Sequence, residues 1–513
     1  MVFRVSAILV LGALLFVVVM RLLFPLPSLV GRQASHAIPA GKETALYRNI
    51  QPLVAANPGK SGILPLFQGT DAFSARMLLA RSAQTSIDAQ YYIWQNDLTG
   101  IPLLNELRKA AERGVRVRLL VDDNGTPDMD AELAALNALP TAEVRVFNPF
   151  NLRSPRLASY LFDFFRLNRR MHNKSFTVDG TATIIGGRNI GDIYFARDAK
   201  TQYSDLDLLA VGAVVPDVAA EFDLYWNSQS AYPHELLVDP PTDGLAVLDR
   251  RHKAVTADAG TAEYAAALLA SPIVRNLMAG TLALHWAETR LVADDPAKGL
   301  GKVPPDRLMI VQLAEIIGTV RSSLDLISAY FVPGDRGVAA LADAVARGAK
   351  VRTLTNSLDA TDVLPVHASY AKYRRKLLAA GVSLFELKSH PTSRLPTADM
   401  HLFGSSASSL HAKTLILDND RVFVGSFNFD PRSVSLNCEM GFLVRSPELA
   451  AEVGQSFQKM IAEESWQVTR GDGGGLIWTD VATGALRTTE PGSSVARTVV
   501  LTVLGWLPVE WLM

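Results

Sequence analysis

A sparse pattern of polar residues occurs twice in this chain of 513 residues. Each copy has a His-x-Lys pair, then an Asp, a Gly and an Asn at the same spacing. The two sets are His172, Lys174, Asp179, Gly186 and Asn189, and His411, Lys413, Asp418, Gly425 and Asn428. Side chains alternate sides along an extended segment, so each pair places an imidazole and an ammonium on one face. The repetition predicts one phosphate site that is built from two half-sites.

The segments that precede the two motifs also match. In each half a strand pattern is followed by a helical pattern that stops at a glycine, and a second strand pattern follows. These segments are 86–93, 101–113 and 115–121 in the first half, and 324–332, 337–347 and 351–354 in the second. We therefore predict an α/β fold with two duplicated domains. Each would be a mixed sheet flanked by helices, and pseudo-two-fold symmetry would bring both to one shared active site.

The length of the chain also requires more than one domain. We predict an N-terminal anchor or signal segment at 1–40 and the two halves at 60–230 and 301–470. A connector would occupy 231–300, where prolines and a charged run interrupt the pattern. A glycine-rich stretch then separates the second half from a C-terminal tail at 471–513.

Composition excludes several classes of protein. Apolar residues make up 49 % and charged residues 20 % of the chain, which is typical of a folded protein. There are 50 basic and 51 acidic residues, and this balance argues against a general nucleic-acid binder with a broad basic surface. The single cysteine, Cys438, excludes an intrachain disulfide and a cysteine metal cage. It leaves the redox compartment open.

The N-terminal segment is apolar or small from Val5 to Met20 and is flanked by Arg4 and Arg21. It indicates either a retained membrane anchor or a signal peptide that is cleaved near residues 35–37. More basic residues follow the apolar segment than precede it, where Arg4 is the basic residue. This difference favours a cytoplasmic location for the main body of the protein, although the side of the membrane is left open.

The C-terminal segment, 495–513, is also apolar and contains Trp506, Pro508 and Trp511. Tryptophans beside a helix break are typical of a segment on a membrane surface. The alternative is a helix or strand that packs against the core. Together the two ends favour association with a membrane.

The two motifs resemble the signature of the phospholipase D superfamily, H-x-K-x4-D-x6-G-S-x-N, over about residues 60 to 470. The flanking segments 169–174 and 186–191 are most similar to bacterial cardiolipin synthases. One departure is Gly187, where the family usually has serine, whereas Ser426 keeps it.

The resemblance implies transfer at a phosphodiester through a covalent phosphohistidine. One histidine attacks phosphorus, and the other protonates the leaving alkoxide and then deprotonates the acceptor. The family pattern favours His172 as the nucleophile and His411 as the acid and base, but the near-symmetry of the motifs leaves the order open. Lys174 and Lys413 would neutralise the phosphate oxygens, so the reaction would need no metal or other cofactor.

Further residues take roles from the same resemblance. Asp205 and Glu439 match carboxylates that orient the histidines, and Asp207 competes with Asp205 for this role. Asp179 and Asp418 belong to the catalytic motifs, but their place at a turn favours a structural role, holding a loop or a lysine. The predicted phosphate-binding side chains are Asn189, Ser426 and Asn428.

The resemblance implies phosphatidyl transfer that forms cardiolipin from phosphatidylglycerol and a second phospholipid, with phosphatidylethanolamine as one candidate. With the apolar N-terminal segment, it also implies a location at the bacterial inner membrane. The partners would be these lipids and the membrane, not nucleic acid, and the oligomeric state is left open. The alternatives are a hydrolytic phospholipase D with water as acceptor, a phosphodiesterase or nuclease, and a membrane scaffold with an inactive site.

Overall fold

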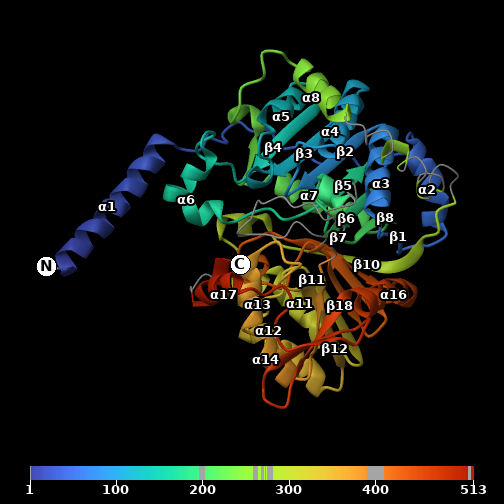
Figure 1. Ribbon diagram of the computed structural model, residues 1–513. Helices are drawn as coiled ribbons and strands as arrows, with labels where there is room; N and C mark the ends of the chain where they lie inside the picture. The colour runs from blue at the N-terminus through green and yellow to red at the C-terminus, as the bar shows by residue number, and fades with distance from the viewer. Residues whose placement is uncertain are drawn as a thin grey trace.

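A computed structural model of the chain (Figure 1) describes residues 2–195, 203–257, 264–266, 268, 271, 273, 276, 281–389, 409–506 and 510–512. The first half contains a mixed sheet in the order β9-β4-β3-β2-β5-β6-β8-β1. Strands β2, β3 and β4 are parallel, and the other pairs are antiparallel. The strands are β1 (Ser61–Leu66), β2 (Ser86–Tyr91), β3 (Arg116–Asp122), β4 (Ala142–Phe147), β5 (Ser175–Val178), β6 (Ala182–Gly186), β8 (Asp207–Gly212) and β9 (Ala231–Pro233).

The second half repeats this arrangement in the order β17-β16-β15-β11-β12-β13-β18-β19-β20. The run β8-β6-β5-β2-β3-β4 thus corresponds to β17-β16-β15-β11-β12-β13. The strands are β11 (Ser323–Ser328), β12 (Lys350–Asn356), β13 (Ser383–Leu387), β15 (Lys413–Leu417), β16 (Arg421–Gly425), β17 (Met440–Arg445), β18 (Ser465–Arg470), β19 (Leu476–Asp480) and β20 (Leu486–Arg487). The predicted duplication of an α/β unit with mixed sheets is confirmed.

Helices cover the sheets in both halves (Figure 1). In the first half they are α2 (Ala45–Ala55), α3 (Gly69–Ser82), α4 (Gly100–Glu112), α5 (Asp130–Asn137), α6 (Tyr160–Leu167), α7 (Val215–Trp226) and α8 (Ala246–Thr256). In the second half they are α11 (Met309–Gly318), α12 (Gly334–Ala346), α13 (Leu364–Ala371), α14 (Arg374–Ala379), α15 (Pro431–Ser435) and α16 (Pro447–Glu464). Local sequence signals define where a helix begins. At α16, the Ser446 hydroxyl accepts a hydrogen bond from the Leu449 N–H at 3.1 Å, and Pro447 is the first residue of the helix.

One ion pair recurs at equivalent positions and shows how closely the halves match. Arg118 on β3 binds Asp88 on β2 at 2.7 Å, and Arg352 on β12 binds Asp325 on β11 at 2.6 Å. Each arginine thereby neutralises a buried carboxylate on the adjacent parallel strand.

Strand β10 (His285–Ala293) joins the two sheets because it pairs with β1 on one side and β17 on the other. It lies in the stretch expected to be a connector, as does β9, which extends the first sheet next to β4. That stretch therefore contributes strands to the fold.

An apolar layer lies between the halves. It includes Ile185 and Leu208 from β6 and β8 and Val424 and Phe442 from β16 and β17, all buried. Burial of this surface fixes the two sheets against each other, and it brings the ends of the motif strands of both halves together.

Each motif aspartate opens a tight hairpin turn. Asp179 and Gly180 join β5 to β6, and Asp418 and Asn419 join β15 to β16, all with φ between 51° and 58°. Two successive residues with positive φ favour the turn whose twist matches antiparallel strands.

The two ends of the chain lie on one side of the molecule (Figure 1). Helix α1 (Val2–Leu23) projects from the body, and α17 (Val495–Trp506) with the short turn η7 (Glu510–Leu512) packs near α13 and α15. Among the described residues, no helix combines the length and apolarity required to cross a membrane.

Candidate active site

The backbone of each motif histidine is held by a carbonyl group of the opposite half. The His172 N–H donates to the Cys438 carbonyl at 2.8 Å, directly before Glu439. The His411 N–H donates to the Ser204 carbonyl at 2.8 Å, directly before Asp205, and β7 (Tyr203–Ser204) pairs there with β14 (Ser409–Leu410). Both histidines thus precede strands β5 and β15 instead of lying within them.

The side chain of each motif histidine also binds a residue of the opposite half. Nδ1 of His172 lies 2.8 Å from Oε2 of Glu439, and Nδ1 of His411 lies 2.6 Å from Oδ2 of Asp205. Each histidine is therefore held by a carboxylate from the opposite half, and neither half contains a complete pair. Asp207 does not compete, because it binds Arg76 at 2.9 Å.

The departure at Gly187 has a steric reason. A Cβ atom built on this residue would lie 2.2 Å from Oδ1 of Asp205, so a serine does not fit there without moving the carboxylate. In the second half the Ser426 hydroxyl donates to Oε2 of Glu439 at 2.5 Å. Ser426 was predicted to bind phosphate, but its hydroxyl is committed to the carboxylate that orients His172.

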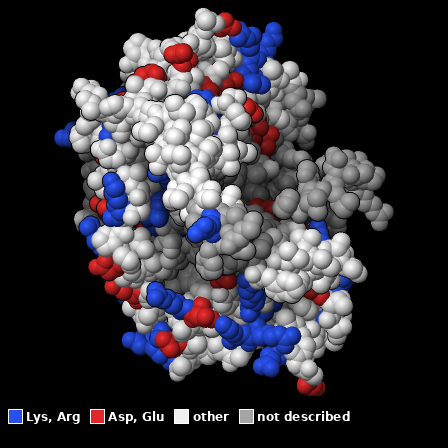
Figure 2. Space-filling view, turned by 90° about the vertical axis from the view of Figure 1, so that its left-hand side faces the viewer, with Lys and Arg blue, Asp and Glu red and all other residues white. Residues whose placement is uncertain are grey.

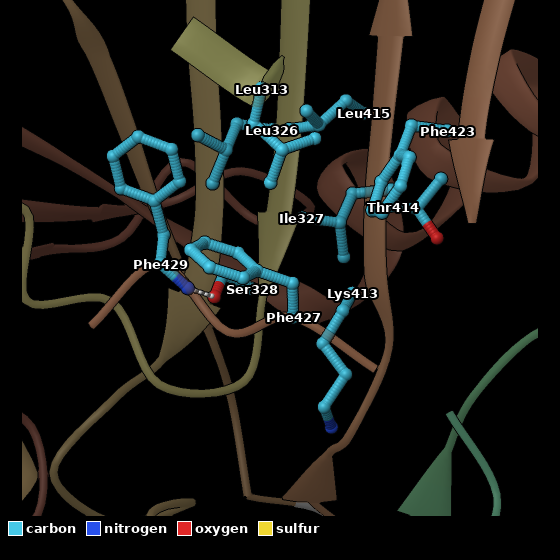
Figure 3. A pocket seen from close by; sticks show the side chains of 10 residues that line it. All are labelled: Leu313, Leu326, Ile327, Ser328, Lys413, Thr414, Leu415, Phe423, Phe427 and Phe429. Atoms are coloured by element: carbon cyan, nitrogen blue, oxygen red, sulfur yellow. Dashed lines mark hydrogen bonds between the residues drawn. The ribbon is translucent and has the colours of Figure 1, made fainter. Parts of the chain in front are cut away.

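The motif lysines are buried beside the histidines. Lys174 Nζ donates to the His172 carbonyl at 2.5 Å and lies 5.6 Å from the centre of the Tyr92 ring. Lys413 Nζ donates to the His411 carbonyl and lies 3.1 Å from its Nδ1. Figure 3 shows the Lys413 stem leaving β15 and its ammonium pointing away from the apolar side chains above it. Each ammonium is thus held beside one of the two motif histidines.

Both histidines line one pocket of about 410 Å³, which also has Asn189 and Asn428 in its wall. The Asn189 amide donates to the Tyr194 hydroxyl at 3.1 Å and its oxygen accepts from the Ile93 N–H at 3.2 Å. These contacts fix the orientation of that amide toward the pocket.

Two tyrosines contact the histidines edge to face. The Tyr92 ring centre lies 5.1 Å from that of His172, and the Tyr194 ring centre lies 5.1 Å from that of His411. Neither tyrosine belongs to a motif in the sequence. Their role as walls of the site depends on tertiary contacts alone.

Asp179 and Asp418 do not line this pocket. The carboxylate of Asp179 accepts from the backbone N–H groups of residues 84–86, just before β2, and that of Asp418 accepts from residues 321–323, just before β11. A direct catalytic role for either aspartate is therefore not supported. Of the two predicted structural roles, both aspartates hold a loop and not a lysine.

Burial sets the protonation of the site. It lowers the pKa of His172 to about 4, and together with Lys413 it lowers that of His411 to about 3. Burial opposes ionisation of Asp205 and Glu439, but contact with their histidines outweighs it, so both pKa values are lowered. Each ring is therefore neutral, with its Nδ1–H donated to a carboxylate and Nε2 unprotonated.

The chain matches the family described as "Cardiolipin synthase, PLD-like domain" over residues 78–209 and 313–461, which cover the two halves. The chain belongs to this family. Within the family, it is 46 % identical over 466 residues to "Cardiolipin synthase C" of Escherichia coli strain K12, covering 90 % of this chain and 98 % of the relative.

Two more distant proteins are also similar to this chain. A "Cardiolipin synthase" of Staphylococcus aureus is 26 % identical over 398 residues, covering 77 % of this chain and 66 % of the relative. A crystal structure of phosphatidylserine synthase from Haemophilus influenzae Rd KW20 aligns with a TM-score of 0.53 at 15 % identity, covering 82 % of this chain and 91 % of that chain. The structural likeness supports the common fold.

Proposed function

We propose that this member of the cardiolipin synthase family transfers a phosphatidyl group onto the headgroup hydroxyl of phosphatidylglycerol and thereby forms cardiolipin. The donor would be a second phospholipid, either phosphatidylglycerol or phosphatidylethanolamine. The domains at 60–230 and 301–470 would each contribute half of the site.

In the first step, Nε2 of His172 attacks phosphorus and a phosphorus–nitrogen bond forms. The bond from phosphorus to the donor's headgroup oxygen breaks, and His411 gives a proton to that oxygen, so that glycerol or ethanolamine leaves. Nε2 of His411 is unprotonated before the donor binds, so it takes this proton from solvent as the bound phosphodiester adds negative charge between the rings.

In the second step, Nε2 of His411 takes the proton from the acceptor hydroxyl, whose oxygen attacks phosphorus as the bond to His172 breaks. Lys174, Lys413, Asn189 and Asn428 would stabilise the charge that develops on the phosphate oxygens in both steps. With water as acceptor the same steps would release phosphatidic acid.

The observation that carries this proposal is the exchange of carboxylates between the halves, which sets two imidazoles in one pocket. Two-step transfer needs such a pair, because one ring carries the phosphatidyl group while the other moves the proton. The 46 % identity with the E. coli enzyme supports the lipid substrate.

The test is to incubate the purified protein with phosphatidylglycerol vesicles and to separate the lipid products. Cardiolipin together with free glycerol is the expected result. Phosphatidic acid without cardiolipin would instead indicate the hydrolase, and no change in the lipids would contradict both.

We also propose that the protein is attached to the bacterial inner membrane on the side from which α1 projects. Arg21 at the end of α1 binds Asp163 of α6 at 2.8 Å, and Phe24 contacts Phe162. The apolar helix therefore leaves the body beside α6. Figure 2 looks at this side and shows a largely uncharged surface at its centre, with charged residues of both signs around it.

Exposed apolar side chains on the neighbouring segments support this orientation. Leu161 and Phe165 of α6 are both 71 % exposed, and Trp506 at the end of α17 is 81 % exposed. The Phe164 ring lies 6.5 Å from that of Trp511, and the next residue, Leu512, lines the active-site pocket. An apolar surface beside the pocket would let a lipid headgroup enter without leaving the membrane.

Removal of residues 2–20 is expected to weaken salt-resistant sedimentation with phosphatidylglycerol vesicles, because the apolar helix is lost. Leu161→Ser with Phe165→Ser should weaken it further, by about 10-fold or more, since two large side chains no longer enter the interface. The control is Leu224→Ser, which removes an exposed leucine on α7. Equal sedimentation of all variants would contradict the proposed orientation.

The pH dependence should depend on Lys174. Burial lowers the pKa of its ammonium to about 7, so it is charged below that pH and loses its proton as the pH rises through it. We expect kcat/KM to fall across this range, because kcat/KM reports the free enzyme. Both histidines are already neutral there. A profile that stays flat through this region would refute the role of Lys174.

A further inference from the structure

A second cavity, of about 480 Å³, lies next to the active-site pocket in the second half. It is formed between α11, α12 and the segment 427–435, which includes α15. Its size is in the usual range for a small-molecule site. Its walls are mainly aliphatic and aromatic and include Ile310, Ile317, Val332, Ala340, Phe427 and Phe429.

The segment 427–430 is shared by both cavities. Asn428 lines the active-site pocket, whereas its neighbours Phe427 and Phe429 line the apolar cavity, and Asp430 lines both. Figure 3 shows the same two phenylalanine rings where they also line a smaller neighbouring pocket with Leu313 and Leu326, on the opposite side from the ammonium of Lys413. The segment that places the Asn428 side chain in the active-site pocket therefore also places two aromatic rings in the apolar cavity.

The charges around this cavity do not suit a polar ligand. Asp335 and Arg336 are exposed at the start of α12, and the Asp430 carboxylate already accepts from the Ser433 N–H at 2.7 Å. The rest of the lining consists of Ser435 and residues without a charged or polar side chain. A flexible hydrocarbon chain fits such walls, because each methylene that leaves water stabilises the complex.

We propose that this cavity binds an acyl chain of the phospholipid whose phosphate occupies the active-site pocket. This proposal rests on the proposed function, which requires a lipid at the histidines. Polar and aromatic side chains form most of the wall of the active-site pocket, beside five aliphatic ones, so we place the acyl chain in the more apolar neighbouring cavity. The short helix α15 lies between the two chambers, since Arg432 lines one and Val434 the other.

The first test fills the cavity from α12. Ala340→Phe should raise KM for long-chain phosphatidylglycerol by about 10-fold or more, the usual effect of a misfit in a hydrophobic pocket. It should leave KM for short-chain phosphatidylglycerol unchanged. Ala339→Phe is the matched control, because Ala339 is the preceding residue, is exposed and does not line the cavity. Equal KM changes for both lipids would overturn the proposal.

The second test measures binding without turnover. Phosphatidylglycerol with a photoreactive diazirine at the end of one acyl chain is irradiated with the full protein, and labelled peptides are identified. Label on residues 309–318 and 334–346, lost in Ala340→Phe and kept in Ala339→Phe, is the expected result. Label confined to other segments would overturn the proposal. If Ala340→Phe does not fold, Ala314→Phe on α11 fills the same cavity from the opposite wall.

The two proposals can fail separately. Specific labelling of these helices without formation of cardiolipin or phosphatidic acid would refute the function and keep the acyl-chain site. Cardiolipin formation with labelling elsewhere would keep the function and refute the site.

Discussion

His172→Ala should lower cardiolipin formation by about 10⁴-fold or more, because it removes the atom that bonds to phosphorus. His411→Ala should cause a similar loss with natural lipids, since the leaving alkoxide then receives no proton. The measurement is the rate of cardiolipin formation from phosphatidylglycerol vesicles by proteins of equal thermal stability. His252→Ala serves as the control, because His252 lies on α8 and does not line the pocket.

An activated donor separates the two roles. With a phosphatidyl ester of nitrophenol, the leaving group needs no protonation, so His411→Ala should still release nitrophenol and accumulate the covalent phosphohistidine. His172→Ala should do neither. The reverse result would make His411 the nucleophile, and activity of both variants with natural lipids would refute the site.

Glu439→Gln and Asp205→Asn should each lower turnover by about 10²- to 10⁴-fold, although neither residue is proposed to touch phosphorus. The carboxylates hold the histidines in the tautomer that keeps Nε2 unprotonated and stabilise each ring when it becomes charged. The neutral amides keep the size of the side chains but remove that charge. Asp217→Asn, an exposed position on α7, controls for a general loss of charge.

The exchange between halves makes this prediction specific. Glu439→Gln should slow formation of the phosphohistidine, because Glu439 holds His172, although the two belong to different motifs. Asp205→Asn should spare that step with the nitrophenol donor, because it acts through His411. If each carboxylate acted on the histidine of its own half, the two variants would show the opposite pattern. Such a pattern would contradict the geometry described above.

Much of the fold could be predicted because its signals are local. Strands at 86–93 and 115–121 were expected from the sequence, and β2 and β3 occupy 86–91 and 116–122. The turn at Asp179 and Gly180 follows from residues that tolerate positive φ. The position of β10 was missed, since it joins two sheets through pairings that are distant in sequence.

The roles of the polar residues were harder to predict. Ser426 and Asn428 are two residues apart in one motif, yet the serine binds Glu439 and the asparagine lines the pocket. The motif also includes Asp418, whose carboxylate instead holds the backbone before β11. A spacing pattern records which residue types occur together, but it does not record which way each side chain points.

The sequence by itself determined the duplication, the residue types of both half-sites and the class of chemistry, because the motifs recur at matched spacing in a chain whose halves have the same strand and helix pattern. Only the tertiary structure decided that Glu439 holds His172 and Asp205 holds His411. Those contacts exist only once the apolar layer between the halves has closed, and burial by the same closure lowers the pKa values of both histidines. The active site is therefore a property of the interface between the two halves.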